Sequence, residues 1–245
     1  MRSLGEQADA YGAMLLAGLE GADVVEIVER DDGFIDASIF GTKLYLAPFR
    51  RWPAHHRRAM RFVRGRVLDV GAGGGRVALH LQERGHEVVA IDLSPGAVEV
   101  CRRRGVRDAR VLSIDDVDEG LGEIDTVVML GNNFGLLADP RKAKRLLRRF
   151  HRLTSERGRM VAETRDVHRT NDPAHLRYLE RNRRRGRMPG QIRIRVRYRD
   201  HATPWFDYLM VSQSELAEVL DGTGWSLGRV IDSDDTYVAV IEKEP

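Results

Sequence analysis

The chain has 245 residues, of which 42% are hydrophobic and 31% are charged, so it suits one medium-sized globular domain with a core of its own. No apolar run reaches the roughly 18 residues of a membrane helix, and the first residues lack the basic-then-apolar pattern of a secretory signal. The single cysteine, Cys101, excludes an internal disulfide and a cysteine-rich metal site, so a reducing, cytoplasmic setting is expected.

The charge balance is mildly basic, with 40 basic and 37 acidic residues, a net charge of +3 and an isoelectric point near 9.2. Of the 40 basic residues, 36 are arginine. Because arginine pairs bidentately with carboxylates and phosphates, a nucleic-acid partner has to be considered. A general compositional bias toward arginine explains the same numbers and is the simpler reading.

The N-terminal segment predicts helices more than strands. Residues 1–20 carry apolar side chains at spacings of three and four, which indicates a helix, and residues 24–47 are apolar without a single period. After a break at two prolines, residues 55–63 are compatible with a short helix. We expect residues 1–60 to form an N-terminal helical lid segment.

A regular alternation of strands and helices begins at Arg66. Each helix begins or ends at a recognisable signal, such as the Ser94-Pro95 start and the glycine that follows a last turn. Apolar strands alternating with helices are typical of a parallel sheet covered on both faces. The predicted strands are 67–70, 87–91, 109–113, 126–130 and 159–164, and the helices between them are 76–84, 94–104 and 140–153.

Residues 166–211 interrupt this rhythm and are rich in arginine. We expect a short helix at 174–184, a mobile loop, and a strand at 191–199 whose apolar and arginine residues strictly alternate. Residues 205–211 could pair with that strand as an antiparallel partner. The arginine face could meet an anionic substrate, a partner subunit or only water.

The C-terminal part predicts a capped helix and two closing strands. Ser212 and Glu215 form a capping-box pattern before a helix at 213–221. The strands at 225–231 and 236–242 are joined by a short acidic turn, which favours an antiparallel pair. The fold class is therefore α/β: a Rossmann-like, seven-stranded, mostly parallel sheet with an antiparallel last strand and helices on both faces. We expect this domain to span 61–245, with an inserted cap at about 166–211.

The most informative stretch is VLDVGAGGGR at 67–76. A strand that ends in closely spaced glycines lets a backbone approach a ligand, and the next helix offers free N–H groups there. Asp92 ends the following strand, 21 residues after Gly71. A carboxylate at that place can accept hydrogen bonds from both ribose hydroxyls of a nucleoside cofactor.

Two cofactors compete for this pattern. A nicotinamide dinucleotide prefers a third glycine where this chain has Arg76, and it would bring its phosphates near the carboxylate of Asp69. A cofactor with a cationic amino-acid end suits Asp69 better. A nicotinamide-dependent oxidoreductase is therefore disfavoured.

The stretch 67–105 resembles the first two motifs of class I S-adenosylmethionine-dependent methyltransferases. The E/DxGxGxG signature is present as Asp69, Gly71, Gly73 and Gly75, and Asp92 is the acid of the second motif. The segments 113–117 and 124–137 resemble the adenine-binding acidic motif and the strand-four motif. The resemblance covers about 60–165 well and 212–242 by pattern, but it covers neither 1–50 nor 166–211.

The resemblance implies S-adenosyl-L-methionine as the cofactor and S-adenosyl-L-homocysteine as the product. It places Asp69 near the ammonium group, Asp92 on the ribose, and Asp115, or its neighbour Asp116, on the adenine amino group. The glycine loop and the strand-four turn would lie along the methionine moiety. The cofactor-binding residues that it implies are Asp69, Gly71, Ala72, Gly73, Asp92, Leu93, Asp115, Asp116, Leu130, Gly131 and Asn132.

The acceptor side carries no motif of comparable strength. Methyl transfer from a sulfonium mainly needs alignment and exclusion of water, so no catalytic residue is assigned and no metal is predicted. Residues 132–135 read Asn-Asn-Phe-Gly, which lacks the Pro-Pro of base-amine methyltransferases and resembles several small-molecule enzymes; a turn asparagine explains it equally well. Tyr11, Asn133 and Glu163 are the tentative substrate contacts. Further acceptor-side candidates are Tyr45, Arg50, Arg51, Arg165, His168, His201, Trp205 and Asp207.

The leading hypothesis is a methyltransferase that acts on a small-molecule acceptor by in-line methyl transfer. One alternative is an RNA or protein methyltransferase that uses the arginines of 141–152 and 177–187, so nucleic acid is possible but not favoured. Another is a non-catalytic protein that binds S-adenosylmethionine. No membrane partner is expected, and the oligomeric state stays open.

Overall fold

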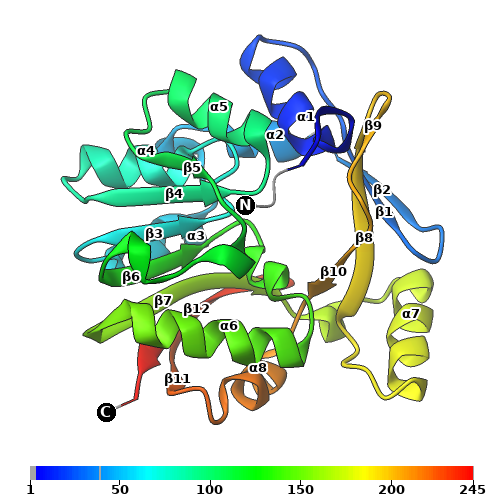
Figure 1. The fold of residues 1–245 in the computed structure, drawn as a ribbon. Helices are drawn as coiled ribbons and strands as arrows, with labels where there is room; N and C mark the ends of the chain where they lie inside the picture. Colours follow the sequence, from blue (N-terminus) through cyan, green and yellow to red (C-terminus); the bar gives the residue numbers. More distant parts are fainter. Residues whose placement is uncertain (1–3, 39, 245) are drawn as a thin grey trace. The chain divides into compact units, whose positions relative to one another are not determined.

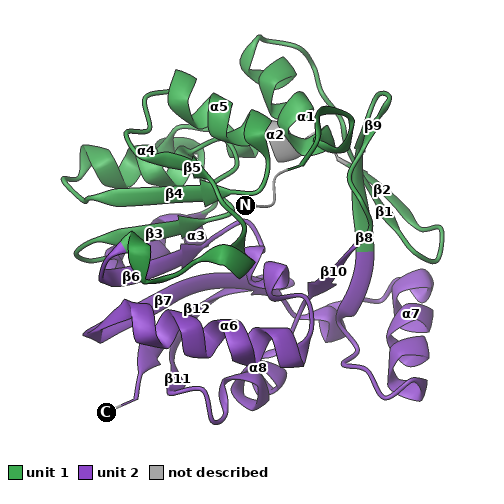
Figure 2. Ribbon diagram, in the orientation of Figure 1, with its two compact units in different colours: residues 1–53, 64–121, 194–205 green, residues 54–63, 122–193, 206–245 purple. Residues whose placement is uncertain are grey.

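The computed structural model describes residues 4–38 and 40–244 of the chain (Figure 1). In this part of the chain the strands form a seven-stranded sheet of order β11-β12-β7-β6-β3-β4-β5 and a second sheet of order β10-β8-β1-β2, in which β9 also pairs with β8. The chain divides into two compact units, coloured separately in Figure 2. Unit 1 comprises residues 1–53, 64–121 and 194–205, and unit 2 comprises 54–63, 122–193 and 206–245.

Unit 1 contains the first half of the α/β pattern. Strands β3 (Val67–Val70), β4 (Val88–Asp92) and β5 (Ala109–Val111) pair in parallel, and the side chains of β3 are buried along its whole length. Helix α4 (Arg76–Glu83) and helix α5 (Pro95–Arg103) connect these strands. The Ser94 hydroxyl caps α5 by accepting from the Ala97 amide at 2.9 Å, as the sequence predicts. The short 3₁₀ turns η4 (Ile114–Asp116) and η5 (Glu119–Leu121) follow β5.

The N-terminal residues of unit 1 form strands as well as helices. They comprise η1 (Glu6–Ala8), α1 (Ala10–Leu19), β1 (Glu26–Arg30), β2 (Ile35–Ser38), α2 (Phe40–Tyr45) and η2 (Phe49–Arg51). Strand β1 pairs antiparallel with β2 and with β8 (Gln191–Tyr198), and β9 is the short strand His201–Ala202. The helix in residues 1–20 is confirmed, whereas the two strands were not anticipated. The role of residues 1–60 as a lid, like the domain boundaries at 60 and 61, stays a prediction.

Helix α1 is anchored on α5 by one carboxylate. Asp9 accepts the Gly12 amide at 3.0 Å, which caps α1, and the Gly96 amide at 2.8 Å, at the first turn of α5. The crossing is so close that a Cβ at Gly96 would lie 2.7 Å from the Gly12 backbone. The absence of side chains at both glycines therefore fixes α1 beside the start of α5.

Unit 2 contains the second half of the sheet. Strands β6 (Ile124–Met129) and β7 (Thr154–Arg165) are parallel, and β12 (Thr236–Lys243) runs antiparallel to β7 and to β11 (Trp225–Ser233). Helix α6 (Pro140–Leu153) begins at the Asp139 cap and buries one apolar face. The other elements of unit 2 are α3 (Ala54–Ala59), η3 (Met60–Phe62), η6 (Asn133–Leu137), η7 (Val167–Arg169), α7 (Pro173–Arg184), β10 (Phe206–Leu209) and α8 (Gln213–Leu220).

The α/β fold class is confirmed: the larger sheet is mostly parallel, and its last strand, β12, is antiparallel. The capping box of Ser212 and Glu215 is present at the start of α8. The predicted helix at 174–184 and strand at 191–199 match α7 and β8 within a residue. Among the described residues, no helix combines the length and the apolar composition needed to cross a membrane.

The arginine face of β8 has partners within the chain, a possibility that the sequence did not raise. Arg195 makes a 2.8 Å ion pair with Glu29 of β1 and stacks its guanidinium over the Trp205 ring. Arg197 reaches the same carboxylate at 3.5 Å. Because one glutamate pairs with two arginines on the neighbouring strand, these side chains stabilise the pairing of β1 with β8.

Candidate functional site

The glycine loop of unit 1 is tied directly to Asp92. The Gly73 amide donates to Asp92 Oδ2 and the Ser94 amide donates to Oδ1, both at 2.9 Å. Gly73 has a φ of +54°, and a Cβ there would lie 2.8 Å from the Tyr11 hydroxyl oxygen. Burial raises the pKa of Asp92 to about 6, although the two amide bonds oppose this rise. The carboxylate is thus oriented by the loop and keeps lone pairs for further donors.

Asp69 is a buried acid without a complete set of partners. Its side chain lies at the end of β3, is 2% exposed, and has one oxygen, Oδ2, that is buried without a hydrogen-bond partner among the described residues. Burial raises the pKa of Asp69 to about 7, against the opposing charge of Arg76. An unsatisfied buried carboxylate costs free energy unless a donor or cation completes it, so this oxygen fits the ammonium group that the resemblance implies.

Tyr11 is brought to the glycine loop by α1. Its hydroxyl approaches Gly73, and its ring packs edge-on against Tyr45 with centroids 5.5 Å apart. The Tyr45 hydroxyl donates to Glu26 Oε2 at 3.1 Å. Burial raises the pKa of Tyr11, and the nearby acids Glu26 and Asp92 raise it further. Tyr11 therefore remains a neutral donor beside the loop at neutral pH.

The remaining predicted residues of unit 1 line the ends of its strands. Ala72 is buried in the glycine loop, whereas Leu93, directly after Asp92, is 37% exposed and apolar. Asp115 is half-buried and Asp116 exposed in η4, where the Ser113 hydroxyl accepts from the Asp115 amide at 3.2 Å. These positions are compatible with an adenine ring, and no contact distinguishes Asp115 from Asp116 as its partner.

In unit 2, the turn after β6 folds around the carboxylate of Glu163. The amides of Gly131 and Asn132 both donate to Glu163 Oε2, at 2.5 and 2.9 Å. Asn132 has a φ of +65°, and its carbonyl oxygen accepts the Tyr208 hydroxyl at 2.5 Å. Leu130 is buried, and Asn132 Oδ1 is buried without a partner in the described chain. The turn after β6 is therefore held by Glu163, at the carboxyl ends of β6 and β7.

Two adjacent histidines complete the Glu163 site. His55 Nε2 and His56 Nε2, both from α3, lie 3.0 and 2.8 Å from the other carboxylate oxygen, Oε1. The exposed fractions of His55, His56 and Glu163 are 7%, 2% and 5%. Burial alone would raise the pKa of Glu163, but the bonds from His55, His56 and the Asn132 amide outweigh it and hold the pKa well below its usual range. Glu163 is thus an ionised carboxylate with four donors.

The histidine pair is the part of this site that sequence reasoning missed. His55 and His56 are separated from Glu163 by 108 and 107 positions, so no local pattern joins them. The one available signal is an adjacent histidine pair at the start of a short helix that follows two prolines. Within the described residues, these three side chains are the one group of histidine, cysteine or acidic residues close enough to offer ligands to a metal ion, but their N···O distances are those of hydrogen bonds.

Several other acceptor-side candidates have ordinary partners within the chain. Arg165 pairs with Asp235 at 3.2 Å, and His168 pairs with Glu215 at 3.2 Å. His201 lies 3.0 Å from its exposed neighbour Asp200. Asp207 lies 3.7 Å from Arg193 and 3.9 Å from Arg187. None of these contacts places the residue beside Glu163 or the glycine loop.

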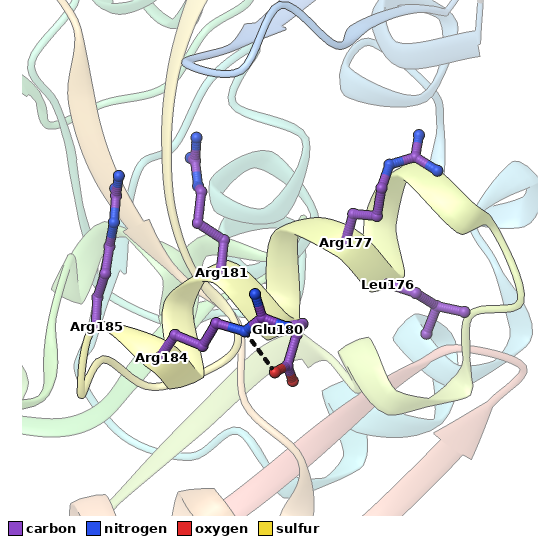
Figure 3. Close-up of a pocket in the computed structure, with 6 residues that line it drawn as sticks. All are labelled: Leu176, Arg177, Glu180, Arg181, Arg184 and Arg185. Carbon is purple, nitrogen blue, oxygen red and sulfur yellow. Dashed lines mark hydrogen bonds and ion pairs between the residues drawn. The ribbon is translucent and has the colours of Figure 1, made fainter.

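Arginines of α7 and Arg185, the residue that follows the helix, line a surface hollow of about 630 Å³ (Figure 3). Arg177, Arg181 and Arg185 point to the same side of the helix in this view, whereas Leu176 points away. Glu180 binds Arg184 at 3.0 Å and is the single acid of the lining. The hollow is basic, and its one carboxylate is bound by Arg184, so its chemistry suits the binding of anions.

A family model described as a methyltransferase domain matches residues 67–158. Curated relatives include a ubiquinone biosynthesis O-methyltransferase from Xanthomonas oryzae pv. oryzae, which is 41% identical over 71 residues. That alignment covers 26% of this chain and 30% of the relative. A protein of the same description from Xylella fastidiosa is 42% identical over 57 residues, which are 21% of this chain and 23% of that relative. The chain thus matches less than a third of the length of these curated relatives.

Solved structures match over a larger part of the chain. A methyltransferase from Bacteroides fragilis, described as dependent on S-adenosylmethionine and solved with S-adenosyl-L-homocysteine, is 27% identical with a TM-score of 0.83. That comparison covers 99% of this chain and 98% of the other. The CcbJ methyltransferase from Streptomyces caelestis is 16% identical, with a TM-score of 0.58 over 82% of this chain and 98% of that one, which is evidence for the fold alone.

Proposed function

Because the chain belongs to the class I S-adenosylmethionine-dependent methyltransferase family, we propose that it transfers a methyl group from S-adenosylmethionine to a small-molecule acceptor. The observation that carries this proposal is the joint placement of Asp69 and Asp92 at the glycine loop of unit 1. Asp92 is oriented to accept from a ribose diol, and Asp69 has a buried oxygen that a cation would complete. A nicotinamide dinucleotide would bring phosphates to the same acids.

The bound cofactor supplies a methyl group already activated by a positively charged sulfur. The chain therefore has to bind, orient and exclude water rather than activate a leaving group. Gly71, Ala72 and Gly73 present their backbone to the methionine moiety, and Asp69 binds its ammonium. Asp92 holds the ribose, and Leu93 packs on the adenine.

Other residues complete the proposed cofactor site. The adenine amino group donates to Asp115 or to its neighbour Asp116. The resemblance also assigns Leu130, Gly131 and Asn132 to the methionine end, and within unit 2 the turn that contains them is held by Glu163. Asn132 Oδ1, which has no partner among the residues that the structure describes, is a further acceptor in that turn.

We assign to α1 the role of the lid over the cofactor. Its support is the anchoring of α1 by Asp9 and the approach of the Tyr11 hydroxyl to Gly73. Tyr11 remains protonated at neutral pH, so it can donate a hydrogen bond to a bound carboxylate. Residues 1–60 thus contribute to binding while residues 61–245 supply the methyltransferase domain, with 166–211 as its cap.

The curated relatives, which are described as O-methyltransferases of ubiquinone biosynthesis, support a small-molecule acceptor. The similarity to them covers a short stretch of this chain. The arginine hollow of α7 favours a second candidate, an RNA acceptor bound through its phosphates. The two candidates differ in which fraction of a cell extract receives the methyl group.

The test is a transfer assay with S-adenosylmethionine that carries tritium in its methyl group. A cell extract is separated into molecules below 3 kDa, RNA and protein, and each fraction is incubated with the enzyme and with Asp92→Ala as the matched control. The proposal expects Asp92-dependent label in the small-molecule fraction. Label in RNA or protein would show that the acceptor is RNA or protein instead of a small molecule. Binding without transfer to any fraction would point to a cofactor-binding protein without catalysis.

A further inference from the structure

We propose that His55 is the general base that removes the proton from a hydroxyl group of the methyl acceptor, so that the product is a methyl ether. The proposal rests on the methyl-transfer function above and adds to it a catalytic residue and an acceptor class. It is carried by the hydrogen-bonded trio of His55, His56 and Glu163 in unit 2.

The ionised carboxylate of Glu163 fixes the proton positions of both imidazoles. A carboxylate accepts hydrogen bonds and donates none, so each Nε2 that lies 2.8–3.0 Å from Oε1 has to carry a hydrogen. A neutral imidazole with hydrogen on Nε2 has its lone pair on Nδ1. Glu163 therefore turns the basic nitrogen of each ring away from itself, the arrangement in which a carboxylate orients a histidine base.

Of the two rings, His55 has the accessible basic nitrogen. Its polar and ring contacts within the described residues are Glu163 and His56, so Nδ1 has no hydrogen-bond partner among them. Nδ1 is not fully buried, so it retains some contact with solvent, although only 7% of the residue is exposed. His56 is 2% exposed and belongs to the supporting structure.

The carboxylate that orients His55 is itself rigidly held. Its second oxygen, Oε2, accepts hydrogen bonds from two backbone amides of the turn after β6. The Tyr208 hydroxyl donates to the carbonyl oxygen of Asn132 in the same turn. The four donors come from helix α3 and from the turn after β6, while Glu163 belongs to β7. Ligands of parallel sheets bind at this carboxyl edge, so the base lies at the edge where an acceptor is expected.

This arrangement indicates a hydroxyl acceptor. Carboxylates are already ionised at neutral pH and need no base. An amine can lose its extra proton to water, bind in its neutral form and attack through its own lone pair. A phenol, enol or alcohol keeps its proton and gains most from a positioned base. The acceptor O–H bond breaks and its proton moves to His55 Nδ1, the oxygen electron pair forms the bond to the methyl carbon, and the electrons of the S–CH₃ bond remain on sulfur. The products are the methyl ether, S-adenosylhomocysteine and an imidazolium beside Glu163.

The first test needs no acceptor. In protein labelled with ¹⁵N-histidine, NMR at pH 8 should show His55 with hydrogen on Nε2 and a bare Nδ1, and Glu163→Gln should shift this tautomer balance. Diethyl pyrocarbonate should acylate His55 at least tenfold faster than His56, as read by fragmentation of the shared peptide. Hydrogen on Nδ1 of His55, or equal reaction of the two rings, would overturn the proposal.

The second test uses the tritium assay with the small-molecule extract. His55→Gln keeps an N–H donor for Glu163 but lacks the basic nitrogen, and His56→Gln is the matched control on the same carboxylate. We expect His55→Gln to slow transfer by about 10²–10⁴-fold. His56→Gln should slow it less than tenfold. Affinity for S-adenosylhomocysteine and the melting temperature of His55→Gln should stay near those of the wild type.

The labelled product decides the acceptor class. A methyl ether survives alkali and is not retained on a cation exchanger in acid, whereas a methyl ester releases its label in alkali and a methylamine is retained. Recovery of an ester or amine, or a His55→Gln rate within threefold of the wild type, would refute the proposal. So would a stoichiometric metal ion that purifies with the protein and is lost in His55→Gln. If no fraction accepts label, the methyl-transfer function fails, while the NMR and acylation results still decide the state of His55.

Discussion

Binding of a ligand with an ammonium group should depend on the ionisation of Asp69. Burial raises the pKa of this carboxyl to about 7, so about nine tenths of it is ionised at pH 8 and about one tenth at pH 6. If the ammonium of S-adenosylhomocysteine binds only the ionised form, the loss of ionised Asp69 should by itself raise the dissociation constant about tenfold over this range. That corresponds to about 1.4 kcal/mol of binding free energy.

Adenosine is the matched ligand because it keeps the ribose and base but lacks the amino-acid end. It should weaken only about twofold between pH 8 and pH 6, because the pKa of Asp92 is about 6 and half of that carboxyl is ionised there. The ratio of the two dissociation constants therefore isolates the contribution of Asp69. Isothermal titration calorimetry of both ligands at pH 6, 7 and 8 measures it.

Asp69→Asn is the variant that separates this explanation from a general effect of pH on the protein. Its ratio of dissociation constants should be the same at all three pH values, because the titrating group has been removed. A ratio that does not change with pH in the wild type, or that changes equally in Asp69→Asn, would refute the assignment of Asp69 to the ammonium.

Two further substitutions, and a stability measurement on Asp69→Asn, test the fold and the site. Asp92→Ala should weaken S-adenosylhomocysteine by about 3 kcal/mol, roughly 100-fold in calorimetry, because two charge-assisted bonds to the ribose are lost; near-wild-type affinity would contradict the ribose assignment. Without ligand, Asp69→Asn should stabilise the protein at pH 8 by up to about 4 kcal/mol, because folding raises the pKa of the Asp69 carboxyl from 3.8 to about 7. The ionised carboxyl therefore destabilises the folded state; this destabilisation is zero below pH 3.8 and reaches its full value above about pH 7. Urea unfolding at pH 8 and pH 4 should show this gain shrinking with acidity, and an equal gain at both would contradict the sign. Asp9→Ala should cost about 1–2 kcal/mol in the same assay, because α1 loses its cap and its bond to Gly96; unchanged stability would show that the anchor contributes nothing.

The arrangement of the glycine loop with Asp69 and Asp92 was predictable because its signals are local. Asp69 and the glycine loop are consecutive, and Asp92 ends the next strand, so periodicity and the parallel-sheet pattern bring them together. The capping residues Ser94, Asp139 and Ser212 were equally readable, since a cap is defined by residues within three positions.

The Glu163 site of unit 2 was not predictable in the same way. The bonds from His55 and His56 to Glu163 cross more than 100 positions, and their formation depends on how α3 packs in unit 2. Glu163 itself could be selected because it lies near the end of a buried strand, but its partners could not.

The pairing of β1 with β8 could not be predicted for the same reason. Glu29 and Arg195 are 166 positions apart, and neither segment contains a pattern that names the other. The alternation of β8 showed that one face is solvated, and the register with β1 decided that its arginines meet a glutamate.

A crystal structure with S-adenosylhomocysteine tests the central claim most directly. The account predicts that both ribose hydroxyls donate to Asp92 and that the ammonium lies within hydrogen-bond distance of Asp69 Oδ2, the oxygen that is buried without a partner among the described residues. A nucleoside bound away from the glycine loop, or an ammonium distant from Asp69, would contradict it.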